Sequence, residues 1–331
     1  MDFQFLFDNF FALTITGLVL GSVYALIALG YTMVYGVLQL INFAHSEVFM
    51  YGSFAATFTI MALGGSSQTS TVGAILMLVL ALGAAMLASG GVALLVERVA
   101  YRPLLKRNAP KLVALISAIG MSFVLAEAMG LRDKITRFFG LDDNFREYVT
   151  RARNNLLFPD VVRPVRLFEV GGYHVTSLDV IIFSTAVLMM VAVDQFIRRS
   201  RLGRGIRSVA QDPESAALMG VNSTRVVQVT FLIGGLMAGA AAFLFVMKYG
   251  VTRYDIGFLL GVKAFTAAVL GGIGNLRGAL LGGLVLGVAE NYGSALFGNE
   301  WKDVVAFTLL VLILLFRPTG LLGEALGKAR A

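Results

Sequence analysis

The chain has 331 residues, of which 57% are apolar and only 14% are charged, and it contains 37 glycines and no cysteine. Apolar runs of about 20 residues recur along it, each long enough to cross a bilayer as a helix, which excludes a soluble globular domain. The net charge of +7 comes from basic residues near the ends of these runs, so it indicates membrane topology and not a nucleic-acid partner.

We therefore expect an all-α, polytopic integral membrane protein with about eight to ten transmembrane helices in a single domain, residues 1–331. No basic segment precedes the first apolar run, so the sequence predicts no cleavable signal peptide. The count is nine, and it becomes eight or ten if a run near 42–63 or 256–273 is re-entrant. The predicted runs are 10–38, 48–63, 72–96, 112–130, 178–197, 226–249, 256–273, 279–296 and 304–316.

Two short basic segments, 97–111 and 198–222, are expected to be cytoplasmic by the positive-inside rule. One span separates each of them from the long polar stretch 131–177, which therefore falls on the external side. That stretch has eight basic residues, but long loops largely escape the rule. The resulting topology has an external N-terminus and a cytoplasmic C-terminus.

The segment 198–222 predicts a short helix. Asp212 is a favourable N-cap, Pro213 suits the first helical position, and Glu214 in the first turn complements the helix dipole. Gly220 can adopt the left-handed conformation that ends a helix, so we expect the helix to run from Pro213 to Met219.

Two interpretations of this helix stay open at this point. Its apolar side chains fit either an incidental helix in a solvated loop or a helix that docks onto a cytoplasmic partner. In the second case Ala216 and Gly220 would face the partner, since small side chains permit close approach. That apolar side consists of Ala216, Ala217, Leu218 and Met219.

Glycine pairs with GxxxG spacing recur in the apolar runs, and such pairs allow helix backbones to approach closely in lipid. The pentapeptide GLVLG occurs at both 17–21 and 283–287. The repeat either reflects helix packing alone or marks two related halves of a transporter, and a single pentapeptide supports the second interpretation only weakly.

Asn42, His45 and Glu47 interrupt the apolar sequence, and polar groups at membrane depth are costly enough to indicate a pathway, a pairing or a cavity. The alternative is a cytoplasmic turn at the membrane interface. Lys263 either extends to the outer interface or lines a path. Glu127 and Glu290 lie near span ends, and we expect them to be interfacial.

Enzyme signatures are missing from the sequence. It has no G-x-x-x-x-G-K-[ST] motif for nucleotide phosphates, no H-E-x-x-H and no G-x-S-x-G. We expect no catalytic residues and no metal site. Such a chain makes sense as a channel subunit that a separate ATPase drives.

Several motifs closely resemble the permeases of branched-chain amino-acid ABC importers, specifically the LivH-type subunit. The resemblance runs from about residue 17 to 323. Ser46 stands where the family usually has glycine, which puts the local backbone geometry in doubt. The motifs are GSVYALIALGYTMVYG at 21–36, INFAHSE at 41–47, LISAIGMS at 115–122, KAFTAAVLGGIG at 263–274, and WKDVV at 301–305 with RPTG at 317–320.

Glu214-Ser215-Ala216 with Gly220 also resembles the EAA-xxx-G loop of importer permeases, although Ser215 replaces the usual alanine. That loop is the ATPase docking site, so the resemblance favours the docking interpretation. It implies coupling residues on this segment, namely Asp212, Pro213, Glu214, Ala216, Ala217 and Gly220. It leaves a substrate pathway near Tyr24, Asn42, His45, Glu47 and Lys263.

The resemblance implies a bacterial inner-membrane permease that imports leucine, isoleucine or valine. Its partners would be two ABC ATPase subunits, a homologous second permease, a periplasmic binding protein and membrane lipid. ATP would be used by the partners, and this chain would need no cofactor. The alternatives are a similar importer of urea, amides or other amino acids, and a secondary transporter acting alone, which would need a buried ion site that the sequence does not offer.

Overall fold

The computed structural model describes residues 3–323, apart from 108, 141–147, 150–151 and 162–163. Its helices and strands in chain order are α1 (Phe3–Asp8), α2 (Phe10–Leu38), α3 (His45–Ala62), α4 (Thr71–Val96), the π-helix η1 (Glu97–Tyr101), α5 (Arg102–Lys106), α6 (Lys111–Gly130), α7 (Arg132–Phe138), β1 (Leu156–Leu157), β2 (Arg166–Val170), β3 (Tyr173–Thr176), α9 (Ser177–Arg199), α10 (Arg201–Gln211), α11 (Pro213–Leu218), α12 (Ser223–Tyr249), β4 (Val251–Thr252), α13 (Ile256–Gly271), α14 (Leu276–Phe297), the 3₁₀-helix η2 (Asn299–Trp301) and α15 (Lys302–Phe316).

Each of the nine predicted apolar runs forms a helix, which confirms the polytopic all-α class. The bilayer core offers no water to backbone groups, so an apolar run must satisfy its own hydrogen bonds as a helix. Six helices of the described chain are long and apolar enough to span a membrane, namely α2, α4 continued through α5, α6, α9, α12 and α14. The other three, α3, α13 and α15, have 18, 16 and 15 residues.

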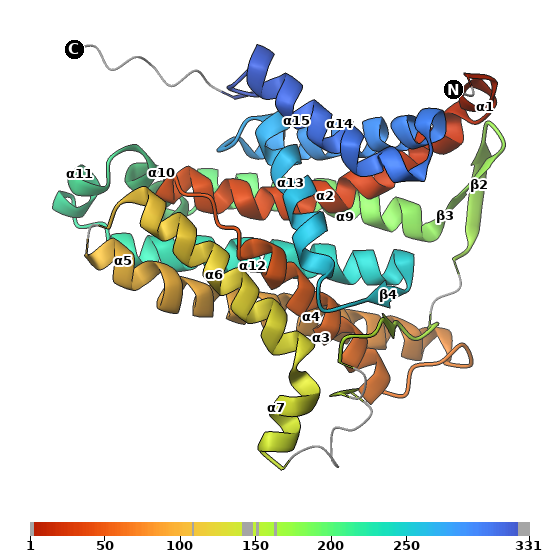
Figure 1. Cartoon of the computed structure of the whole chain (residues 1–331), viewed down its shortest axis with the longest axis horizontal. Coiled ribbons are helices and arrows are strands. Elements are labelled where there is room, and N and C mark those ends of the chain that lie inside the picture. Colours follow the sequence, from red (N-terminus) through yellow and green to blue (C-terminus); the bar gives the residue numbers. More distant parts are fainter. Residues whose placement is uncertain (1–2, 108, 141–147, 150–151, 162–163, 324–331) are drawn as a thin grey trace.

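The long helices α2, α9 and α12 run side by side along the long axis of the molecule (Figure 1). Helices α10 and α11 lie at one end of this axis, and α1 and the β2–β3 hairpin lie at the other. Helix α13 crosses the direction of α2 and α12 in this view. The two ends of the bundle therefore differ, one helical and basic, the other carrying the short sheet.

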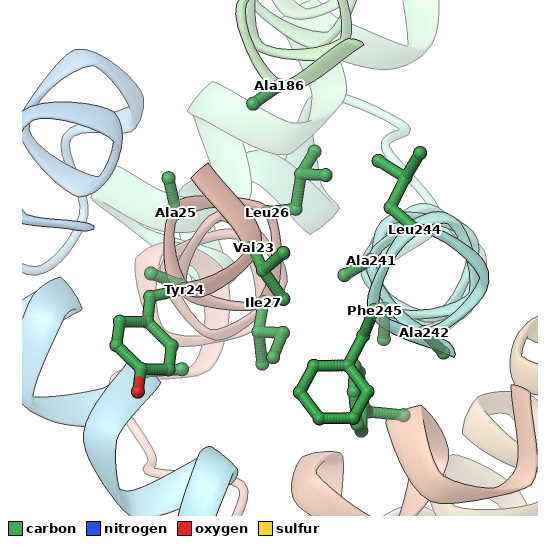
Figure 2. Packing of buried hydrophobic residues seen from close by; sticks show 14 of the residues in the cluster. Val23, Tyr24, Ala25, Leu26, Ile27, Ala186, Ala241, Ala242, Leu244 and Phe245 are labelled. Atoms are coloured by element: carbon green, nitrogen blue, oxygen red, sulfur yellow. The ribbon is translucent and has the colours of Figure 1, made fainter. Parts of the chain in front are cut away.

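Helix α2 lies at the centre of the bundle, and its residues 21–34 are all buried. On one side Val23, Leu26 and Ile27 face Ala241 and Phe245 of α12 (Figure 2). The ring of Tyr24 lies on another side of α2, with its hydroxyl directed away from α12. A helix buried on every face is expected to be apolar all round, as this sequence is.

The two GLVLG repeats pack against each other where α2 crosses α14. A Cβ added at Gly21 would lie 2.6 Å from the carbonyl oxygen of Gly283, and one at Gly17 would lie 2.7 Å from the Cα of Val288. Any side chain at these positions would force the helices apart. The repeated pentapeptide is thus accounted for by one close helix crossing, as the packing interpretation predicted.

The stretch 131–177 is anchored to the bundle by buried charged side chains. Arg132 donates from Nη1 to the carbonyl oxygens of Met129 and Ala152, and its guanidinium lies 4.9 Å from the ring centroid of Phe54. At the start of α9, Asp179 pairs with Lys248 of α12 at 2.5 Å. These contacts fix both ends of the stretch to the membrane helices.

Candidate functional site

The predicted short helix begins where the sequence indicates. Asp212 Oδ1 accepts from the backbone amides of Glu214 at 3.0 Å and Ser215 at 3.2 Å, and Oδ2 accepts from the Ser215 hydroxyl at 2.5 Å. Pro213 occupies the first turn of α11. The hydrogen bonds from the side chain and backbone of Ser215 and the backbone of Glu214 lower the pKa of Asp212, because they favour its ionised form.

The helix also ends as predicted, within one residue. Gly220 has φ of +82°, and its amide donates to the carbonyl of Ala217 at 3.0 Å, while the amide of Val221 donates to the carbonyl of Ala216 at 3.0 Å. This pattern is the Schellman termination that favours glycine. A Cβ added at Gly220 would meet no atom within 4 Å, so only the backbone conformation requires glycine there.

One prediction about the faces of this helix is wrong. Ala216 is 5% exposed and packs with Val209 and Val226 inside the chain, so it does not face a partner. The surface that α11 offers consists of Leu218 and Met219, which are 89% and 87% exposed, beside the exposed residues Glu214, Ala217 and Gly220. Ala216 is the side chain by which this short helix packs on the rest of the chain.

Sequence reasoning missed the preceding helix, α10. Its buried positions Gly203, Ile206 and Val209 are three residues apart, and the arginines 201, 204 and 207 are exposed. Apolar residues at this spacing lie on one face of a helix, and this pattern was the signal available in the sequence, although the many charges around it obscured it. The helix supports α11 from the inside and leaves a basic face outside.

His45 and Glu47 lie in the first turn of α3 and Asn42 lies just before it, and each is no more than 2% exposed. The stretch is therefore not an exposed turn at the interface. We call Asn42, His45, Ser46 and Glu47 the inner polar cluster. The cluster contacts α2, since the ring centroids of His45 and Tyr31 lie 4.8 Å apart. It also contacts α6, through Glu47 and Ser122.

Hydrogen bonding in the inner polar cluster is incomplete. Glu47 Oε1 accepts from the hydroxyls of Ser122 at 3.2 Å and Ser46 at 3.3 Å, and Asn42 Oδ1 accepts from the hydroxyl of Tyr101 at 3.3 Å. Within the described chain, Glu47 Oε2, His45 Nε2 and Asn42 Nδ2 are buried without a partner. Such groups are costly unless another molecule or another conformation satisfies them.

Lys263 and Tyr24 belong to a second group, which we call the ionic cluster, with Glu290 and Asp303. Lys263 Nζ lies 2.7 Å from Glu290 Oε1 and 2.7 Å from Asp303 Oδ1. The Tyr24 hydroxyl donates to Glu290 Oε2 at 2.9 Å. The cluster joins α2, α13, α14 and the start of α15.

The ionic cluster shows partners that the sequence did not predict. Lys263 is 5% exposed and Glu290 is 1% exposed, so both are buried inside the chain, and their position relative to the membrane interface stays a prediction. Glu127 does lie at the surface, where it pairs with Arg153 at 2.6 Å. Burial of Lys263 and Glu290 is tolerated because each meets an opposite charge.

The five predicted pathway residues thus separate into two places. Asn42, His45 and Glu47 share the inner polar cluster, while Tyr24 and Lys263 share the ionic cluster. No group of three or more His, Asp or Glu side chains that could hold a metal occurs in the described part of the chain.

Comparison with known proteins places these features in a family. Residues 13–314 match the family model described as the permease component of branched-chain amino acid transport systems. The chain is 45% identical over 312 residues to the high-affinity branched-chain amino acid transport system permease protein BraD of Pseudomonas aeruginosa, covering 94% of each. No solved structure matches the chain significantly.

Two further relatives cover similar lengths. The chain is 44% identical over 325 residues to the high-affinity branched-chain amino acid transport system permease protein LivH of Escherichia coli strain K12, covering 98% of each. It is 22% identical over 313 residues to the probable branched-chain amino acid transport permease protein LivH of Methanocaldococcus jannaschii, covering 92% of this chain and 90% of the relative.

Proposed function

The chain belongs to the family of permease components of branched-chain amino acid transport systems, and on that premise we propose that it carries leucine, isoleucine and valine across the bacterial inner membrane. The observation that carries this proposal is identity of 44–45% to two such permeases over 94–98% of the chain. A multi-pass bundle with a buried polar interior supports it.

In the proposed importer this chain forms the pathway with a homologous second permease. Two ABC ATPase subunits bind on the cytoplasmic side and use the ATP, so this chain needs no cofactor and has no catalytic residues. A periplasmic binding protein delivers the substrate. Exposed apolar side chains on α4, α6 and α9 fit contact with lipid or with the second permease.

The proposed orientation has an external N-terminus and a cytoplasmic C-terminus. Its support is that the basic helix α10 and α11 lie at the end of the bundle opposite α1 and the β2–β3 hairpin (Figure 1). The positive-inside rule then assigns the α10–α11 end to the cytoplasm. Residues 198–222 become the cytoplasmic loop and 131–177 the external loop.

We propose that α11 is the coupling helix. Leu218 and Met219 are almost fully exposed at its tip, and a helix tip with two exposed apolar side chains fits insertion into a groove of another subunit. Asp212, Pro213 and Gly220 shape the helix, and Ala216 anchors it to α10 and α12. Glu214 and Ala217 are exposed beside the tip.

The proposed pathway uses the inner polar cluster, with Asn42, His45 and Glu47 as contacting residues. Tyr24 and Lys263 position the helices around the pathway and do not contact the substrate. Lys263 is already paired with two acids, and Tyr24 is already hydrogen-bonded to Glu290. Their bonds hold α13, α14 and α15 on α2.

The test of the function is uptake by the assembled importer. Co-expression of the chain with its second permease, ATPases and binding protein should give ATP-dependent uptake of radiolabelled leucine, isoleucine and valine into proteoliposomes. Uptake by the chain alone without ATPases would instead indicate a secondary transporter. Uptake of urea or amides but not of these amino acids would contradict the assigned substrate class.

The coupling helix is tested with Gly220→Val and a matched control, Gly172→Val in the β2–β3 turn. Both glycines have φ near +80°, and a Cβ at either would meet no atom within 4 Å, so the two variants carry the same backbone strain. Gly220→Val should reduce ATPase copurification and uptake at normal membrane abundance, and Gly172→Val should not. Normal ATPase association of Gly220→Val would favour a solvated loop.

A further inference from the structure

Helix α13 closes on the start of α3 through two glycines. A Cβ added at Gly257 would lie 2.8 Å from Glu47 Oε2 and 2.5 Å from the carbonyl oxygen of Ser46. One added at Gly261 would lie 3.2 Å from the Tyr31 hydroxyl. The missing side chains let the backbone of α13 cover the carboxylate of Glu47 directly.

Only one of the two oxygens of the Glu47 carboxylate is hydrogen-bonded. Glu47 Oε1 accepts from two serine hydroxyls, Ser46 and Ser122, whereas Oε2 accepts from no group of the described chain. No ion pair with Glu47 occurs among the described residues, and Lys263, a buried cation on α13, is paired with Glu290 and Asp303 instead. Burying a carboxylate oxygen without a donor is costly, so a water, a ligand or a proton on the carboxyl group has to offset that cost.

An apolar cavity lies farther along α13, beyond Gly261, and Tyr31, which packs on His45 of the inner polar cluster, forms part of its wall. Its volume is about 10 Å³, which is room for a single water. Ligand pockets measure roughly 300 Å³ or more, so the cavity is closed to an amino acid in this conformation. Its lining consists of Tyr31, Tyr35, Ile41, Phe265, Ala268 and Ile273.

Tyr31 connects the polar and apolar parts of this region. Its ring packs edge-on against the imidazole of His45 at 4.8 Å and against Phe265 of α13 at 6.1 Å. A carboxylate beside an aromatic and aliphatic wall matches a molecule with an ammonium group at one end and an aliphatic chain at the other. A water molecule would gain nothing from the apolar wall, and a carboxylate at Glu47 would repel an anion.

We propose that the α3–α13 contact is a substrate subsite, which opens when α13 moves away from α3. Glu47 accepts hydrogen bonds from the α-ammonium group of the amino acid, and Tyr31, Ile41 and Phe265 hold its branched side chain. This inference rests on the proposed function and assigns roles within it. Charge-assisted hydrogen bonds to a carboxylate in a dry site are among the strongest available, so Glu47 contributes to selection of amines.

The first experiment needs no substitution. The complete importer, cycling with ATP and its binding protein, is photolysed with a leucine analogue that carries a diazirine in its side chain, and the labelled peptides are mapped by mass spectrometry. Adducts should form at Ile41 or Phe265, or within one helical turn of them, and excess leucine should suppress them. Adducts confined to other regions of this chain or to the second permease would overturn the proposal.

The second experiment separates binding from cycling. Glu47→Gln keeps the size of the side chain and an acceptor for the serines but removes the charge, so leucine uptake and photolabelling should each fall at least tenfold. ATP hydrolysis stimulated by the loaded binding protein should persist, since α13 still moves. The matched control is Glu127→Gln, a half-exposed acid paired with Arg153, which should keep uptake within twofold.

The outcomes distinguish the inference from the function. Unchanged uptake in Glu47→Gln, with the unmodified importer active, would mean that the site holds a water only and would refute the subsite alone. An unmodified importer that moves no amino acid would refute both. If Glu47→Gln fails to accumulate, photolabelling of the unmodified chain decides the question by the criteria given for the first experiment.

Discussion

The ionic cluster predicts a specific order of stability losses. Lys263→Met keeps the length and the apolar stem of the side chain but removes the cation from the cluster. Glu290, which is 1% exposed, then retains one donor, the Tyr24 hydroxyl at 2.9 Å. Removing one partner of a buried ion pair costs about 3–5 kcal/mol, because the other charge is left uncompensated.

Substitutions at Glu290 and Asp303 should lower the free energy of unfolding by less than Lys263→Met does. Glu290→Gln leaves Lys263 paired with Asp303 at 2.7 Å and preserves an acceptor for Tyr24, so we expect a loss of about 1.5–3 kcal/mol from one charged hydrogen bond. Asp303 has a side chain that is 46% exposed, and Asp303→Asn should cost roughly 0–1 kcal/mol. The double variant Lys263→Met with Glu290→Gln should be more stable than Lys263→Met alone, since no buried charge remains unpaired.

Trp301 provides the assay. It is the single tryptophan of the chain, it lies directly before α15, and its ring centroid is 6.1 Å from that of Phe297. Its fluorescence during denaturant unfolding in detergent micelles reports on the helices that the cluster joins. The reasoning is refuted if Lys263→Met destabilises no more than Asp303→Asn, or if the double variant is less stable than Lys263→Met.

Three further predictions concern segments outside the membrane helices. The pKa of Asp212 is lowered in the folded chain, so its cap stabilises α11 fully above the usual Asp pKa of about 3.9, and this stabilisation is lost as the pH falls through the lowered value. Protection of the α11 amides, measured against their intrinsic exchange rates, should fall over that pH range, and Asp212→Asn should abolish this pH dependence. Arg132→Met should increase proteolysis of the adjoining 148–154 segment, because the carbonyls of Met129 and Ala152 lose a charged donor worth about 1.5–3 kcal/mol, and unchanged cleavage would contradict the anchoring role. Reporter fusions after Arg204 and after Phe168 should read as cytoplasmic and external respectively, and the reverse result would overturn the topology.

Most of the fold could be predicted because lipid leaves the chain few choices. An apolar run at membrane depth must close its own hydrogen bonds, so all nine runs became helices. The cap at Asp212 and the termination at Gly220 are equally local, since each depends on residues no more than four positions away. Local rules therefore gave the ends of α11 almost to the residue.

The parts that could not be predicted depend on how helices cross. Lys263 and Glu290 are 27 residues apart, and their pairing follows from the packing of α13 on α14, which no periodicity in either helix encodes. The burial of Ala216 likewise depends on α10 and α12 lying behind α11. Polar residues at membrane depth, such as Glu47 and His45, indicated from the sequence that some of their polar atoms lack partners. Only the structure shows which atoms these are.

Helix α13 contacts both clusters, since it covers the inner polar cluster and carries Lys263 of the ionic cluster. Helix α13 has 16 residues and carries Lys263, which is held by Glu290 and Asp303, two positions before Phe265, which lines the closed cavity. The ion pairs hold the middle of α13 near α14 and α15, while Gly257 and Gly261 in its first half lie against Ser46 and Glu47 of α3. The proposed opening therefore requires the first half of α13 to separate from α3 while the ion pairs keep its middle near α14. Movement of α13 about Lys263 would therefore uncover Glu47 without dismantling the bundle.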